Sequence, residues 1–295
     1  KGVDDARDRL RAVARVQRGE RQVAGLRERQ RCFDGLEVAH FADEHNVGVL
    51  AQHRLQGLLD PLELPEPEEI GRLAASRALA RLGSRRAPTS EVPVIFEAPL
   101  VAGLIGTFVQ AASGGSLYRK SSFLLDALGK PVFSSNVNLV EDPHIPKALG
   151  STPYDDEGVS TQKRVIVEDG ILRGYFLGSY SARKLGMQST GNAGGSHNLL
   201  LQPGKESLEA LIAGMGRGLL VTELLGQGVN NVTGDYSRGA AGFWVENGRI
   251  AYPVHEITIA GNLKDMFRNI VAIGNDVLIR GGKQCPSIMI GKMMV

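Results

Sequence analysis

Apolar residues recur along the chain with two different periods, and each period predicts one type of secondary structure. The stretch from Leu100 to Val109 places its apolar residues at the 3.6-residue period of a helix, which predicts a buried helix ending near Ser113–Gly115. The stretch from Leu208 to Met215 shows the same period behind Ser207, a residue type that favours a helix N-cap. We therefore expect one buried helix and one amphipathic helix.

Two short apolar runs separated by a turn pair predict antiparallel hairpins. The first hairpin surrounds Asp169-Gly170 between residues 165 and 172, and the second surrounds Asn247-Gly248 between residues 243 and 252. Both turn pairs tolerate the positive φ angles that tight hairpin turns need. Antiparallel sheet is therefore expected.

Further elements are predicted from the residues that begin and end them more than from the spacing of their apolar residues. Glu68 to Leu82 is expected to be helical, because acidic residues begin it and Gly83 can cap its end. Val92–Phe96 predicts a strand, and 269–278 and 286–290 predict further strands or short helix-strand units. Helices and antiparallel strands in mixed order favour an α+β fold, with antiparallel or mixed sheets, flanking helices and Gly-rich loops.

The composition divides the chain into three parts. Residues 1–60 are rich in arginine and poor in aromatics, which predicts a charged segment, helical or disordered. Residues 61–90 contain a linker with three prolines and then the predicted helix, and residues 91–295 form the α+β domain.

Charge and hydropathy exclude several classes of protein. The 34 basic and 32 acidic residues nearly cancel, so direct nucleic-acid binding is not expected. The longest apolar stretch, residues 98–112, is shorter than the roughly 20 residues that span a bilayer, and no secretory signal opens the chain. Cys32 and Cys285 form neither a disulfide framework nor a paired zinc motif. We expect a cytoplasmic protein that does not contact membranes.

The segment from Ser189 to Asn198 is rich in glycine and polar residues and contains His197. It resembles a phosphate cradle only superficially, because it lacks the Gly-Lys-Ser/Thr of a P-loop and the strand that precedes a dinucleotide motif. Either it is a polar turn that approaches another backbone, or His197 contributes to ligand binding.

Metal ligands are sparse in the sequence. His255-Glu256 begins like the zinc-protease pattern H-E-x-x-H, but Ile259 occupies the second histidine position and the local pattern favours a strand. Cys285 is a weak metal candidate, since a single buried cysteine is more often a packing residue. No catalytic residue and no metal site is therefore assigned to this chain.

The segment Thr233–Gly239 is dense in functional side chains and flanked by glycines. Arg238 could bind a peptide carboxylate or carbonyl, with Asp235 orienting it through a paired hydrogen bond. The alternative is an internal Asp235–Arg238 pair that only shapes a loop. Together with His197, these two residues are the candidates for substrate binding.

Several longer strings carry a resemblance to a known family. They are residues 118–126 (YRKSSFLLD), 151–155 (STPYD), 179–186 (SYSARKLG), 191–195 (GNAGG), 233–248 (TGDYSRGAAGFWVENG), 256–266 and 273–276. Together they resemble the PmbA/TldE branch of the TldD/PmbA metalloprotease family over about three quarters of the chain. Family members carry an additional N-terminal domain, which residues 1–60 do not resemble.

The resemblance implies a cytoplasmic protein that pairs with a TldD-type subunit in a zinc protease acting on peptides or unfolded proteins. In the family, TldD holds zinc through an H-E-x-x-x-H helix and a distant cysteine, and the PmbA/TldE subunit lacks the histidine pair. The corresponding helix near Leu100–Ala112 has no histidine, and only Cys285 is similar to the ligand cysteine. Zinc is therefore expected in the partner and no cofactor in this chain.

Two alternatives remain open. The chain could hydrolyse peptides itself with Cys285 and either His255 or His197, although no third orienting group is identifiable. It could instead regulate a target associated with DNA gyrase, as an older description of the family suggests.

Overall fold

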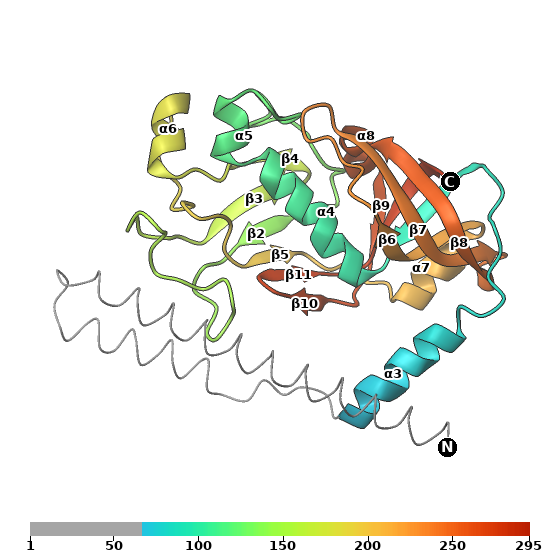
Figure 1. Cartoon of the computed structure of the whole chain (residues 1–295). Helices are drawn as coiled ribbons and strands as arrows, with labels where there is room; N and C mark the ends of the chain where they lie inside the picture. The colour runs from blue at the N-terminus through green and yellow to red at the C-terminus, as the bar shows by residue number, and fades with distance from the viewer. Residues whose placement is uncertain (1–66) are drawn as a thin grey trace, which may run out of the picture. The chain divides into compact units, whose positions relative to one another are not determined.

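The computed structural model describes residues 67–295, which fold into two six-stranded β-sheets with helices packed against them (Figure 1). Both sheets contain antiparallel and parallel strand pairs, so the predicted α+β class is confirmed. The predictions for residues 1–60 and for the proline-rich linker that follows fall outside the described residues.

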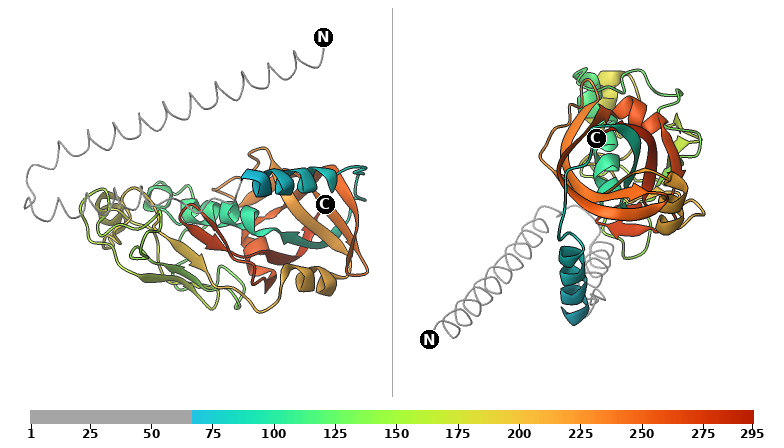
Figure 2. Two further views of the ribbon diagram at one scale, coloured as in Figure 1. Left: turned by 90° about the horizontal axis from the view of Figure 1, so that it is seen from below. Right: turned by 90° about the vertical axis from the view of Figure 1, so that its right-hand side faces the viewer.

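The first sheet closes on itself as a small barrel. Its strands, in spatial order, are β1 (Glu91–Phe96), β6 (Gly218–Leu225), β7 (Asp235–Glu246), β8 (Arg249–Asn262), β12 (Ile288–Met294) and β9 (Ile270–Ile273). Strand β1 also pairs with β12 along its whole length, which closes the ring seen end-on in Figure 2 (right). Closure leaves fewer unpaired strand edges than an open sheet of the same size would have.

Alternation along the strands gives the barrel an inner and an outer apolar face. Val94, Leu219 and Trp244 point into the main core and are 0% exposed. Their neighbours Ile95 and Leu220 belong to a smaller core that lies under helix α7 (Leu208–Met215). Because successive strand residues point to opposite faces, both faces are buried only where a helix covers the outside.

The second sheet is assembled from two distant parts of the chain. Its spatial order is β10 (Leu278–Arg280), β11 (Lys283–Cys285), β5 (Leu199–Leu201), β2 (Leu139–Glu141), β3 (Arg164–Glu168) and β4 (Ile171–Leu172). The chain leaves the barrel after β1 to form β2 to β5, and leaves it again after β9 to form β10 and β11. Strand β11 then pairs in parallel with β5.

Helix α4 (Ala98–Ala111) joins the two sheets. It contacts β6 of the barrel and both β10 and β11 of the second sheet. Phe108 of α4 is 0% exposed and packs edge-to-face on Phe133, with ring centroids 5.0 Å apart, and on Phe267. The remaining described helices are α3 (Pro67–Leu79), α5 (Gly114–Tyr118), α6 (Ser179–Leu185) and α8 (Leu263–Arg268). Among helices of residues 67–295, none has the length and apolar character needed to cross a membrane.

The strongest local predictions are confirmed. Helices α4 and α7 lie where the periods placed them, and the Ser207 hydroxyl accepts a hydrogen bond from the Ala210 amide as an N-cap. Both hairpin turns have positive φ, at 47° and 78° for Asp169-Gly170 and at 51° and 71° for Asn247-Gly248. The first helix is shorter than expected, because α3 ends at Leu79 and a turn continues to Gly83.

Two glycines give opposite predictions for the same substitution. An added Cβ at Gly242, at a bulge between β6 and β7, would lie 1.9 Å from the carbonyl oxygen of Leu220, whereas an added Cβ at Gly103 meets nothing within 4 Å. We expect Gly242→Ala to lower the free energy of unfolding by about 1–3 kcal/mol through overpacking. Gly103→Ala, in an exposed helical position, should raise it by about 0.4–1 kcal/mol. Urea unfolding of both variants checks this, and equal effects would contradict it.

Candidate functional site

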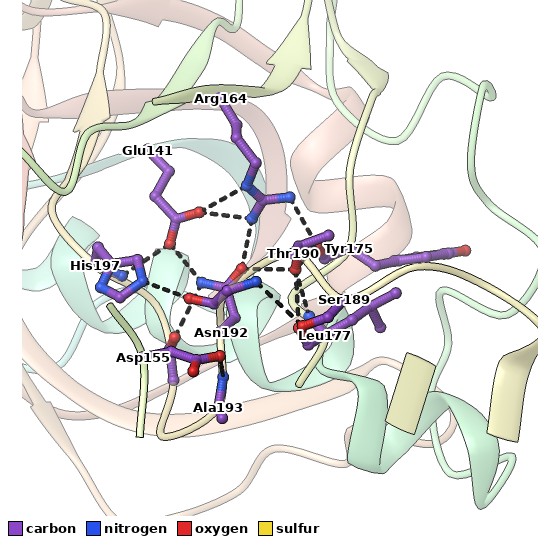
Figure 3. A network of polar contacts seen from close by, with 12 residues as sticks. Glu141, Asp155, Arg164, Tyr175, Leu177, Ser189, Thr190, Asn192, Ala193 and His197 are labelled. Carbon is purple, nitrogen blue, oxygen red and sulfur yellow. Dashed lines mark hydrogen bonds and ion pairs between the residues drawn. The ribbon is translucent and has the colours of Figure 1, made fainter. Parts of the chain in front are cut away.

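A buried ion pair fixes the centre of the second sheet. Glu141 ends β2 and is 0% exposed, and its register partner Arg164 begins β3. The Nε and Nη2 atoms of Arg164 donate to Glu141 Oε2 over 3.1 and 2.6 Å (Figure 3). Such two-nitrogen contacts between guanidinium and carboxylate hold both groups in a defined orientation.

The Gly-rich segment, residues 189–198, is hydrogen-bonded to this ion pair. Asn192 donates to Glu141 Oε1 over 2.8 Å and accepts from Arg164 over 2.8 Å. The backbone amide of His197 donates to the same carboxylate oxygen over 2.8 Å. Glu141 thus receives four donated hydrogen bonds, which satisfies a carboxylate that has no access to water.

The imidazole of His197 is engaged by the backbone. Its Nε2 lies 2.7 Å from the carbonyl oxygen of Gly191, so this nitrogen donates, and the residue is 9% exposed. Gly191 itself has a φ of 70°, and a Cβ there would lie 2.8 Å from the carbonyl oxygen of Ser160. The segment is thus a polar turn that approaches neighbouring backbone, one of the two alternatives drawn from the sequence.

Asp155 holds a second turn against the Gly-rich segment. Its Oδ1 accepts the amides of Glu157 and Val159, each over 2.9 Å, and its Oδ2 accepts the amide of Ala193 over 2.9 Å. Burial favours the protonated acid, but the three amide donors outweigh burial, so the pKa of Asp155 lies below its usual 3.8. The ionised carboxylate therefore stabilises the folded chain.

This arrangement predicts a pH-dependent contribution to stability. Asp155→Asn should cost about 1–3 kcal/mol at pH 7, because an amide nitrogen cannot accept from an N–H group. Since the folded-state pKa is lowered, the stabilisation is present above the unfolded-state pKa near 3.8 and is lost as pH falls through the folded-state value. Thermal unfolding between pH 7 and 3 should therefore show the two proteins converging in acid. Asp156→Asn, at the exposed neighbour, is the control and should change little.

The structure separates the two candidates of the 233–239 segment. Asp235 and Arg238 both belong to strand β7, three positions apart, so they point to opposite faces. The Asp235 carboxylate accepts from Thr233 over 2.6 Å and from Asn262 over 3.1 Å. Arg238 contacts the carbonyl oxygen of Leu225 over 3.5 Å. The Asp235–Arg238 hydrogen bond considered from the sequence is therefore not formed, because both residues lie on strand β7 and not in a loop.

Cys285 lies at the contact between β11 and α4. The residue is 0% exposed, and burial raises the pKa of its thiol to about 12, so it is a neutral thiol at physiological pH. The ammonium group of Lys283, from the same strand, lies on α4 at Gly106, 3.9 Å from the point where a Cβ would stand. A zinc ligand must be a thiolate, and a neighbouring cation opposes binding of Zn²⁺.

The described residues do not fit a catalytic zinc. Within residues 67–295, no three His, Cys, Asp or Glu side chains are grouped so that they could hold a metal ion. His255 lies on β8 of the barrel, next to a bulge at which Glu256 has a φ of 51°, and its Nδ1 is buried without a partner. Cys285 belongs to the other sheet, and His197 is bonded to Gly191, so no Cys–His dyad forms among these three residues.

Comparisons with known proteins agree on one family. Residues 89–295 match the model of the PmbA/TldA metallopeptidase C-terminal domain. Metalloprotease PmbA of Escherichia coli O157:H7 is 54% identical over 233 residues, which are 79% of this chain and 52% of that protein. The chain therefore spans about half the length of this curated relative.

Two crystal structures share the fold. A candidate modulator of a DNA gyrase from Thermotoga maritima has a TM-score of 0.74 at 38% identity, covering 79% of this chain and 56% of that one. TldE from Thermococcus kodakarensis has a TM-score of 0.69 at 29% identity, covering 77% of this chain and 55% of that one.

Proposed function

The chain belongs to the PmbA/TldA metallopeptidase family, and from this membership we propose that it is the PmbA/TldE-type subunit of a two-component zinc peptidase. In this proposal a TldD-type subunit supplies the zinc, and the present chain contributes surface for assembly and for the peptide substrate. The observation that carries the proposal is the combination of a metallopeptidase fold with a donor set that does not fit zinc.

The chemistry of the α4–β11 contact supports this division of labour. A catalytic zinc usually needs three protein ligands and one open position. Helix α4 has no histidine along its length, and its neighbour Cys285 is a buried thiol beside the ammonium of Lys283. A bound zinc would polarise a peptide carbonyl and activate water. In this chain the place between α4 and β11 is occupied by packed side chains instead.

The test is a reconstitution with the TldD-type protein of the same organism. We expect the two proteins to copurify and to cleave an unfolded protein substrate, with cleavage lost on addition of a chelator and absent for either protein alone. Metal analysis of the isolated 295-residue chain should find no stoichiometric zinc. Chelator-sensitive cleavage by this chain alone, or one zinc per chain, would contradict the proposal.

Regulation of a gyrase-associated target is the second candidate. It is favoured by the description of the Thermotoga maritima structure as a candidate gyrase modulator. Its test is a supercoiling assay with purified gyrase, in which an effect of the chain without its peptidase partner would support this second candidate.

A further inference from the structure

Helices α5 and α6 lie side by side (Figure 1), and the residues in and just after them include four cationic side chains. A Cβ added at Gly114, the first residue of α5, would lie 2.2 Å from the hydroxyl oxygen of Ser181 in α6, so the two helices are in close contact. The two helices and the residues that follow α5 carry two tyrosines and four cations, all exposed except Tyr118, which is half-buried. We call this set the α5–α6 surface; it consists of Tyr118, Arg119, Lys120, Tyr180, Arg183 and Lys184.

The two tyrosines form a platform that positions two of the cations. Their rings meet edge-to-face with centroids 5.7 Å apart, and the Tyr180 residue is 52% exposed. The guanidinium of Arg119 lies over the Tyr118 ring at 5.4 Å, and the ammonium of Lys184 lies over the Tyr180 ring at 5.6 Å. Contacts of this kind restrict long side chains that would otherwise move freely in water.

The positive charge of this surface is not neutralised within the described residues. The ion pairs of residues 67–295 join other cations to carboxylates, and none includes a residue of the α5–α6 surface. The carboxylate of Glu157 accepts the Ser179 amide at the start of α6, whereas Arg183 and Lys184 lie in the last turn of that helix. An anionic group can therefore approach the cations directly.

The geometry favours carboxylates over nucleic-acid bases as the bound groups. Stacking of a base needs an open aromatic face, but each tyrosine ring already carries a cation of the chain over one face, and the edge-to-face contact at 81° covers the second face of one of the two rings. What the surface offers outward is guanidinium and ammonium donors, which match carboxylate oxygens.

We propose that the α5–α6 surface binds an acidic segment of a polypeptide. Resting on the proposed function, this segment belongs to the peptide substrate, which the surface would hold while cleavage occurs at the zinc of the partner subunit. The surface would then give the complex a preference for substrates that carry clustered aspartate or glutamate.

A binding assay on the isolated full chain tests the proposal. The probe is a fluorescently labelled ten-residue glutamate peptide, compared with its glutamine counterpart at about 50 mM salt. We expect binding of the glutamate peptide only, and Arg119→Gln/Lys184→Gln should weaken it by about tenfold. The matched control is Lys130→Gln/Lys205→Gln, which removes the same charge at two exposed lysines elsewhere and should weaken binding less than about twofold.

Three results would overturn the proposal. They are no binding of the glutamate peptide, equal loss in the control variant, and tighter binding of a single-stranded oligonucleotide that is lost in the same double variant. The last result would assign the surface to nucleic acid. Because the assay uses neither zinc nor the partner subunit, its failure is distinguishable from failure of the reconstitution. Unchanged thermal unfolding of the exposed variants shows that loss of binding is not loss of fold.

Discussion

Replacing Arg164 by methionine is expected to lower the free energy of unfolding by about 3–5 kcal/mol. The substitution keeps much of the aliphatic bulk but leaves the carboxylate of Glu141, which is 0% exposed, without its cation. Breaking a buried pair costs more than the pair itself contributes, because the remaining charge cannot return to water. Denaturant unfolding, with the midpoint and slope both recorded, measures the change.

The chain offers a matched control for this experiment. Arg173 and Glu168 form an ion pair in the same part of the second sheet, but their side chains are 44% and 53% exposed. Arg173→Met should therefore change the free energy of unfolding by no more than about 1 kcal/mol. If both variants lost the same amount, burial would not be the cause. Hydrogen exchange of the His197 backbone amide should increase in Arg164→Met, since this amide donates to the Glu141 carboxylate.

Replacing Trp244 by alanine should cost about 3–5 kcal/mol, because it empties the interior of the barrel. Trp244 is 0% exposed and belongs to the main core, and its Nε1 donates to Glu246 over 3.1 Å. The ring also lies under the guanidinium of Arg217 at 5.5 Å. A closed barrel has little freedom to collapse around the missing ring, so most of the lost volume remains as a cavity.

Phe243 provides the comparison on the same strand. It is the preceding residue, points to the outer face and is half-buried against the small core under α7. Phe243→Ala should cost about 1–2 kcal/mol, since less apolar surface becomes exposed. A loss for Phe243→Ala equal to that for Trp244→Ala would mean that the barrel interior is not the tighter core.

The sequence alone was sufficient for features that depend on neighbouring residues. The period of residues 100–109 predicted α4, and Asn247-Gly248 predicted the turn between β7 and β8, because helical spacing and positive φ are local properties. The long strings shared with PmbA/TldE proteins also indicated the family, which the comparisons then confirmed.

Features that join distant residues were decided only by the tertiary structure. Nothing local predicts that β11 pairs with β5, which places Cys285 and Lys283 against α4. The sequence did not predict the Glu141–Arg164 ion pair either. The two residues are 23 positions apart, and they meet only because β2 and β3 pair in this register.

The tertiary structure also decided which of the candidate site residues meet. From the sequence, Asp235 and Arg238 are candidates for substrate binding because they lie close together along the chain, yet the strand turns their side chains to opposite faces. His197 was named for its imidazole, and the fold uses that ring to hold a glycine carbonyl. The sequence thus determined the local elements and the family, while the fold determined which side chains meet, because those contacts depend on how the strands pair across long stretches of chain.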